Sequence, residues 1–170
     1  MSSKDTELTL DGINTLAAEI RAGDGPGTQA WDRGTSHTNR FNEAVVDALR
    51  ENKGKVPGEL EKATLLIITT IGAKSGEKRT VPLSYVVIDG RLLLIASMGG
   101  AQRNPPWYHN LVKHPEVLVE KDGVSFSARA VVTEGEDRDR LFGIICQRIP
   151  NFADYQTRTD RVIPVVELVR

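Results

Sequence analysis

Hydrophobic residues in the first third of the chain recur at helical spacing. An apolar stripe runs over 11–22, where Asp11 can cap the helix and Gly23 can end it. A second stripe over 38–51 has apolar residues at i, i+3, i+4, i+7 and i+8, which is a full amphipathic face. Residues 1–60 are therefore predicted to form an N-terminal helical extension.

From residue 63 onward the pattern changes to short apolar and β-branched runs, which is typical of strands. Asp89-Gly90 and Asp122-Gly123 are turn pairs that favour tight hairpins. The predicted strands are 63–70, 80–88, 91–96, 117–121, 124–132 and 161–168; helices are predicted over 107–113 and 136–149, with a polar connection before the last strand. Residues 61–170 are thus predicted to be an α+β domain, a small barrel with a mostly antiparallel six-stranded sheet and peripheral helices.

Composition narrows the function classes further. The 170 residues carry 22 basic and 23 acidic groups, and this balance argues against a nucleic-acid partner. The apolar runs are far shorter than a membrane-spanning helix, and the N-terminal residues have no secretory pattern. Cys146, the single cysteine, excludes an intrachain disulfide and suits a reducing compartment. We therefore expect a cytoplasmic protein.

The charge is unevenly distributed along the chain. Residues 60–114 hold seven basic and three acidic groups, a net charge of +4, while the remainder holds 15 basic and 20 acidic groups, a net charge of −5. A basic middle within an acidic chain favours a local anionic ligand. Chance clustering of solvated charges is the alternative.

The connection 71–79 is the first candidate for binding. Its two glycines allow close approach of a ligand to the backbone, and Lys74, Lys78 and Arg79 supply positive charge. Phosphate is the natural partner of such a set, because arginine offers a planar fork and lysine a point charge. An ordinary charged hairpin is the competing interpretation.

The stretch 96–111 is the second candidate. Gly99-Gly100 follow a strand end, and Trp107 and Tyr108 then open a short helix whose N-terminal dipole favours an anion. These ingredients suit a planar cofactor without being specific to one. Alternatively, Trp107 plugs the end of the barrel and His109 lies on the surface.

The stretch 151–164 is the third candidate, because Tyr155 can donate a hydrogen bond or a proton to a substrate. Packing of its ring with the hydroxyl in water is the alternative. The three histidines have no metal-ligand spacing, and no Gly-x-Ser-x-Gly nucleophile motif is present. The sequence therefore predicts neither a metal site nor a covalent nucleophile.

Four blocks taken together resemble the deazaflavin-dependent nitroreductases of actinobacteria. They are Thr-Thr-Ile-Gly-Ala-Lys-Ser-Gly at 69–76, Ala-Ser-Met-Gly-Gly at 96–100, Pro-Pro-Trp-Tyr-His-Asn-Leu at 105–111 and Tyr-Gln-Thr-Arg-Thr-Asp-Arg-Val-Ile-Pro at 155–164. The resemblance implies a split β-barrel that binds coenzyme F420, a deazaflavin with a phosphate and an oligoglutamate tail. It also implies an oxidoreductase that transfers hydride from the reduced deazaflavin to an electron-poor small molecule, such as an enone, a quinone or a nitro compound.

The resemblance also implies site residues, matched position by position. Ser97 and Tyr155 are the expected catalytic residues, with either of them or water as the proton source. Phe152 and Tyr155 are the expected lining of the substrate pocket. The expected cofactor-binding residues are Ala73, Lys74, Ser75, Arg79, Thr80, Val81, Pro82, Leu83, Ser84, Ile95, Ala96, Ser97, Met98, Pro106, Trp107, Tyr108, His109 and Asn110.

Three positions depart from the family pattern. Ala73 and Met98 replace an arginine and a lysine, which removes two positive charges. Phe152 stands where members that reduce nitroimidazoles carry a tyrosine, and a phenyl ring can neither hydrogen-bond a nitro group nor pass a proton. This argues against nitroimidazole activation and leaves enones and quinones open.

Two other functions fit the same pattern. A protein that binds the deazaflavin without catalysis is one alternative, and an FMN-dependent oxidase on the same barrel is the other. Contact of residues 1–60 with a substrate or with a membrane surface also stays open, and the sequence does not indicate an oligomeric state.

Overall fold

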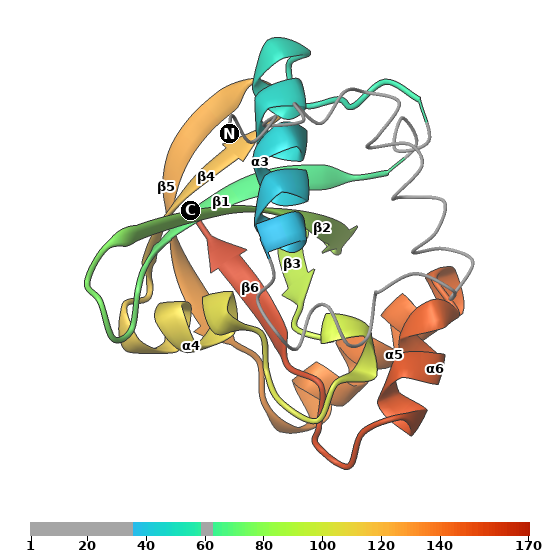
Figure 1. Ribbon diagram of the computed structural model, residues 1–170. Helices are drawn as coiled ribbons and strands as arrows, with labels where there is room; N and C mark the ends of the chain where they lie inside the picture. Colours follow the sequence, from blue (N-terminus) through green and yellow to red (C-terminus); the bar gives the residue numbers. More distant parts are fainter. Residues whose placement is uncertain (1–35, 59–62) are drawn as a thin grey trace.

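Six antiparallel strands close into a barrel in the computed structural model of this chain, which describes residues 36–58 and 63–170 (Figure 1). The strands follow the order β1-β2-β3-β6-β5-β4 around the barrel, and every neighbouring pair is antiparallel. They are β1 (Leu65–Ile71), β2 (Lys78–Ile88), β3 (Arg91–Ile95), β4 (Glu116–Lys121), β5 (Val124–Val132) and β6 (Val165–Val169). The predicted antiparallel barrel is confirmed, while the helix predicted over 11–22 lies outside the described residues.

The two Asp-Gly turns form as the sequence predicted. Asp89 and Gly90 have φ values of 52° and 74°, and Asp122 and Gly123 have φ values of 53° and 79°. Two successive residues with positive φ are the signature of the hairpin turn whose twist matches that of the strands. The turns therefore set the pairing of β2 with β3 and of β4 with β5.

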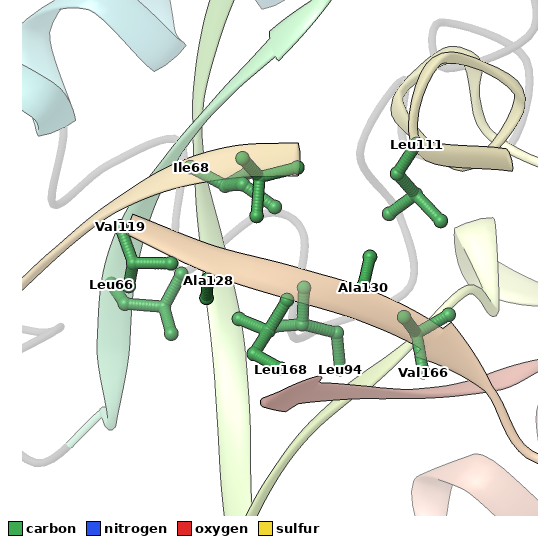
Figure 2. Close-up of a cluster of buried hydrophobic side chains, with 10 residues drawn as sticks. Leu66, Ile68, Leu94, Leu111, Val119, Ala128, Ala130, Val166 and Leu168 are labelled. Carbon is green, nitrogen blue, oxygen red and sulfur yellow. The ribbon is translucent and has the colours of Figure 1, made fainter. Parts of the chain in front are cut away.

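The barrel interior is filled by alternating residues of the strands, because successive side chains of a strand point to opposite faces. Leu66 and Ile68 of β1 meet Val119 of β4 and Leu94 of β3 in one buried cluster (Figure 2). Leu111 from helix α4 (Pro106–Lys113) joins the same cluster, and Trp107 and Tyr108 pack against it. Helix α4 thus packs on the barrel core through several side chains.

Three helices cover parts of the outside of the barrel (Figure 1). Helix α3 (Ser36–Glu51) packs Val45 and Leu49 on Ile67 of β1. Helix α5 (Gly135–Arg148) packs Leu141 and Ile145 on the outer faces of β3 and β6, where partly buried side chains of α6 (Asn151–Thr157) join them. Among the described residues, no helix combines the length and apolar character that crossing a membrane requires.

The segment before the last strand differs from the prediction. The predicted polar connection contains helix α6, and β6 begins at Val165 rather than near residue 161. The helix forms because Phe152 and Tyr155, three residues apart, pack on the α5 side of the barrel. The strand starts late because the Arg161 side chain is hydrogen-bonded to a neighbouring loop and Pro164 has no N–H to donate to a sheet.

Candidate functional site

Strand β2 pairs with its two neighbours over different parts of its length. Strand β2 pairs with β1 from Lys78 to Ser84, but it pairs with β3 only from Tyr85 onward, where Tyr85 lies opposite Leu94. After β3, the Ala96 N–H donates to the oxygen of Pro164, just before β6, at 3.0 Å, so the chain there bonds to the β6 side and not to β2. The other edge of β2 over 78–84, here called the free edge of β2, therefore has no strand partner within 63–170.

The predicted cofactor-binding residues of β2 lie along this edge. Arg79, Thr80 and Ser84 are exposed, whereas Val81, Pro82 and Leu83 are half-buried. Val81 and Leu83 pack against the barrel interior together with Trp107 and Tyr108, so the edge and helix α4 share one apolar cluster. The expected residues from β2 and from α4 are thus brought together by the barrel core.

The hairpin 72–77 at the start of the free edge is held by its own hydrogen bonds. The Gly72 N–H donates to the Glu77 oxygen at 2.7 Å, and the Glu77 N–H donates to Ser75 Oγ at 3.2 Å. Lys74 is exposed, and among the described residues Arg79 forms a surface ion pair with Glu77 at 3.4 Å. A surface pair of this kind is weak, so both cations can turn to an anion. The Ser75 hydroxyl, in contrast, already accepts a hydrogen bond inside the hairpin.

Asn110 joins this hairpin to helix α4. Its Oδ1 accepts the Ala73 N–H at 2.9 Å, and its Nδ2 donates to the Thr70 hydroxyl at 3.1 Å. Lys113 on the next turn donates to the Ala73 oxygen at 2.6 Å. Asn110 is buried, and both ends of its amide are engaged in holding the hairpin. The hairpin and the end of helix α4 are therefore held side by side.

A tight turn lies where the chain leaves β3, at the other end of the free edge. The short 3₁₀ helix η1 (Met98–Gly100) has positive φ at all three residues, 47°, 63° and 84°. The Gly100 N–H donates to the Ser97 oxygen at 2.9 Å, and Ser97 itself is buried. Since Leu94 pairs with Tyr85, this turn begins beside one end of the free edge, and α4 ends beside the other.

Helix α6 lies directly on this turn. A Cβ built on Gly100 would stand 2.6 Å from the Tyr155 oxygen and 2.9 Å from Arg158 Cβ. Only a glycine permits this approach. The rings of Phe152 and Tyr155 meet edge to face at 5.8 Å, and both are half-buried. The backbone of Tyr155 thus lies against the loop that contains Ser97, while the rings of Phe152 and Tyr155 pack on the α5 side of the barrel.

The remaining predicted residues have more peripheral positions. Pro106 and His109 of α4 are exposed, and His109 meets the edge of Tyr108 at a ring distance of 5.8 Å. Trp107 packs on the barrel core, which agrees with the alternative that it plugs the barrel. Ile95 is buried under α5, on the outer side of the sheet. No described residue group of three or more His, Cys, Asp or Glu is arranged to hold a metal ion.

Sequence reasoning missed the polar residues that build the loop 96–104. Hydrogen bonds link four side chains to one another or to one another's backbone: Gln102, Gln156, Thr159 and Arg161. Three of them belong to the fourth family-like block, in which only Tyr155 had an expected role. Their type and spacing are visible in the sequence, but two of the bonds that reach the loop join residues 57 and 60 positions apart, so no local pattern identifies them.

A cavity of about 120 Å³ lies on a different face, between α3 and strands β1, β4 and β5. Arg50 and Glu120, which line it, form two hydrogen bonds of 3.0 and 2.9 Å with each other. None of the predicted site residues lines this cavity.

Comparisons with known proteins agree with this geometry. The family model for F420H(2)-dependent quinone reductases matches residues 41–169. An F420H(2)-dependent quinone reductase of Mycobacterium tuberculosis is 39% identical over 135 residues, which are 77% of this chain and 89% of that protein. The chain is therefore closely similar to this reductase along most of both sequences.

Two solved structures are similar as well. An F420-H2 dependent reductase, FDR-A, is 39% identical with a TM-score of 0.55, over 61% of this chain and 92% of that one. A chain described as a domain-swapped dimer is 34% identical with a TM-score of 0.58, over 78% of this chain and 99% of that one. From its sequence blocks, its barrel and these likenesses, the chain belongs to the F420H2-dependent quinone reductase family.

Proposed function

We propose that this protein is a reductase that takes hydride from reduced coenzyme F420 and delivers it to a quinone-type acceptor at the free edge of β2. The observation that carries the proposal is the hydrogen bond from the Ala73 N–H to Asn110 Oδ1. It holds hairpin 72–77, which is followed by Lys78 and Arg79, against helix α4. Coenzyme F420 supplies a two-electron hydride when bound. Reduction of a quinone to a hydroquinone then requires one hydride and a proton.

The residues along the free edge suit an anionic, planar ligand. Lys74, Lys78 and Arg79 place three exposed cations at the hairpin end, where a phosphate or a carboxylate tail can reach them. The apolar side chains of Val81 and Leu83 lie further along the same strand and suit a ring system. The positive charge at the hairpin end suits the anionic tail of F420, and the apolar side chains further along β2 suit its deazaflavin ring.

The acceptor is proposed to lie beside α6, against Phe152 and Tyr155. The Phe152 ring offers apolar contact to a quinone and no proton. We assign proton donation to the Tyr155 hydroxyl, with the Ser97 hydroxyl or water as the other sources. The chain's contribution is then to orient the two reactants and to exclude water between them.

A spectroscopic assay tests the activity. Reduced F420 and menadione are mixed with the protein, and return of the visible absorbance of oxidised F420 is followed. Turnover with menadione supports the proposal, and Tyr155→Phe is expected to lower the rate without weakening cofactor binding. Tight binding without turnover across quinones and enones contradicts the proposal and favours a non-catalytic binding protein.

A binding titration tests the cofactor site. F420 is expected to bind more tightly than FMN, and FMN preference favours the oxidase alternative instead. Arg79→Ala removes a charged partner of the anion, which weakens F420 affinity by about 10-fold or more. Arg129→Ala is a matched control, since Arg129 has a 62% exposed side chain paired with a glutamate, as Arg79 has at 58%. The control variant is expected to bind like the wild type.

The domain boundary and the cellular compartment are also proposals. The boundary near residue 60 separates a helical extension from the barrel, although α3 packs on β1 through Val45 and Ile67. The single cysteine favours a reducing compartment such as the cytoplasm. Nothing in the described residues supports a membrane contact, and it forms no part of the proposal.

A further inference from the structure

The guanidinium of Arg161 binds four oxygens of the loop 96–104. Its Nε donates to the Ala101 oxygen at 2.8 Å, and its Nη2 donates to the Ser97 oxygen at 2.8 Å. Its Nη1 donates to the Ala96 oxygen at 3.1 Å and to Asn104 Oδ1 at 2.8 Å. One side chain therefore gathers both ends of the loop around a single planar group.

All four of these acceptors are neutral. Buried charges are normally paired with an opposite charge, because burial removes the hydration of the ion. Burial accordingly lowers the pKa of Arg161. An arginine guanidinium nevertheless stays protonated in proteins, so the group carries its positive charge at neutral pH. A half-buried cation that binds only carbonyl and amide oxygens in these contacts stabilises a backbone shape rather than an ion pair.

The segment that carries Arg161 is itself fixed to the same loop. The Gln156 Nε2 donates to the Arg161 oxygen at 2.8 Å, and the Arg161 N–H donates to the Thr159 hydroxyl oxygen at 3.3 Å. Gln102 of the loop donates to the Arg158 oxygen at 2.9 Å and accepts from the Thr159 hydroxyl at 3.2 Å. Two sets of polar contacts therefore tie loop 96–104 to the end of α6.

The loop needs such support because its backbone is unfavourable. Met98, a residue with a side chain, has a φ of 47°, and it is followed by two glycines with positive φ. Residues other than glycine rarely adopt this conformation, so the surrounding structure must impose it. The Arg161 contacts at Ala96, Ser97 and Ala101 flank the strained turn on both sides.

We propose that Arg161 is a positioning residue that holds loop 96–104 in the shape required for F420 binding and locks it to α6, which carries Phe152 and Tyr155. The inference rests on the proposed function, because the loop borders the proposed cofactor site. The role requires the planar guanidinium of arginine, since a lysine ammonium cannot reach oxygens of four different residues in one plane.

Three variants test the proposal by titration with F420, followed by fluorescence. Arg161→Ala and Arg161→Lys are both expected to bind F420 about 10- to 100-fold more weakly, because a loop displaced by an ångström misplaces the ligand groups. Added guanidinium chloride at low, non-denaturing concentration is expected to restore part of the affinity of Arg161→Ala, whereas equal sodium chloride is not. Arg148→Ala is the matched control, since Arg148 donates to the Val87 oxygen at 2.8 Å, away from the loop.

Amide hydrogen exchange without cofactor provides the second measurement. The Gly100 and Ala101 amides, which donate to Ser97 and Met98 oxygens, are expected to exchange faster in both Arg161 variants than in the wild type and in Arg148→Ala. Unchanged exchange, or wild-type F420 affinity in Arg161→Lys, overturns the inference. Failure of the wild type to bind F420 instead contradicts the proposed function, while the exchange rates still report whether Arg161 fixes the loop.

Discussion

Replacement of Gly100 by alanine tests the contact between loop 96–104 and helix α6. Two costs add at this position. A left-handed backbone, here with φ of 84°, costs a residue with a Cβ about 1–2 kcal/mol. The new Cβ would also stand 2.6 Å from the Tyr155 oxygen, and overpacking of this kind costs about 1–3 kcal/mol. Gly100→Ala is therefore expected to lower the free energy of unfolding by about 2–5 kcal/mol.

Gly90→Ala separates the two costs. Gly90 has a similar φ of 74°, but a Cβ built there meets nothing within 4 Å. Its substitution carries only the backbone cost, so the two variants should differ by about 1–3 kcal/mol in reversible urea unfolding. Quinone reduction should fall further in Gly100→Ala, because either the loop or the helix carrying Tyr155 has to move. Equal stability of the two variants would refute the close approach of α6 to Gly100.

Three further outcomes follow from particular contacts. Asn110→Ala leaves the Ala73 N–H without its partner, so urea unfolding should show a loss of about 1–3 kcal/mol and F420 binding should weaken. Burial raises the pKa of the Cys146 thiol, so a thiol reagent at neutral pH should label it more slowly in the folded than in the unfolded protein. Hydrogen bonds from Arg91 lower the pKa of Asp137 from 3.8; the stability difference between the wild type and Asp137→Asn should therefore shrink as pH falls from 7 through that folded-state pKa.

The strands of this protein are well predicted from local sequence. Alternating apolar residues and the two Asp-Gly turns are local signals, and the six expected strands all form. Helix α6 was missed because its apolar residues, Phe152 and Tyr155, are few and lie among polar ones. Its stability comes from packing on α5 and on Gly100, and neither contact is visible in the seven residues of the helix.

Some residues of the candidate site are recognisable from the sequence, whereas the roles of others depend on contacts made in the folded barrel. The cations Lys74, Lys78 and Arg79 are recognisable by type alone, since exposed charge near glycines suits an anion wherever it occurs. The roles of Asn110 and Arg161 are different, because both act through partners far along the chain. Asn110 meets Ala73 across 37 residues, and Arg161 meets Ala96 across 65.

By itself, the sequence determined the antiparallel strands and their Asp-Gly turns, the charge of the binding region and, through its four blocks, the family. Only the tertiary structure decided which polar side chains hold the loops and which remain exposed along the free edge of β2. The physical reason is that secondary structure and charge depend on neighbours in sequence. Burial and hydrogen bonding, in contrast, depend on groups that become neighbours only when the barrel closes.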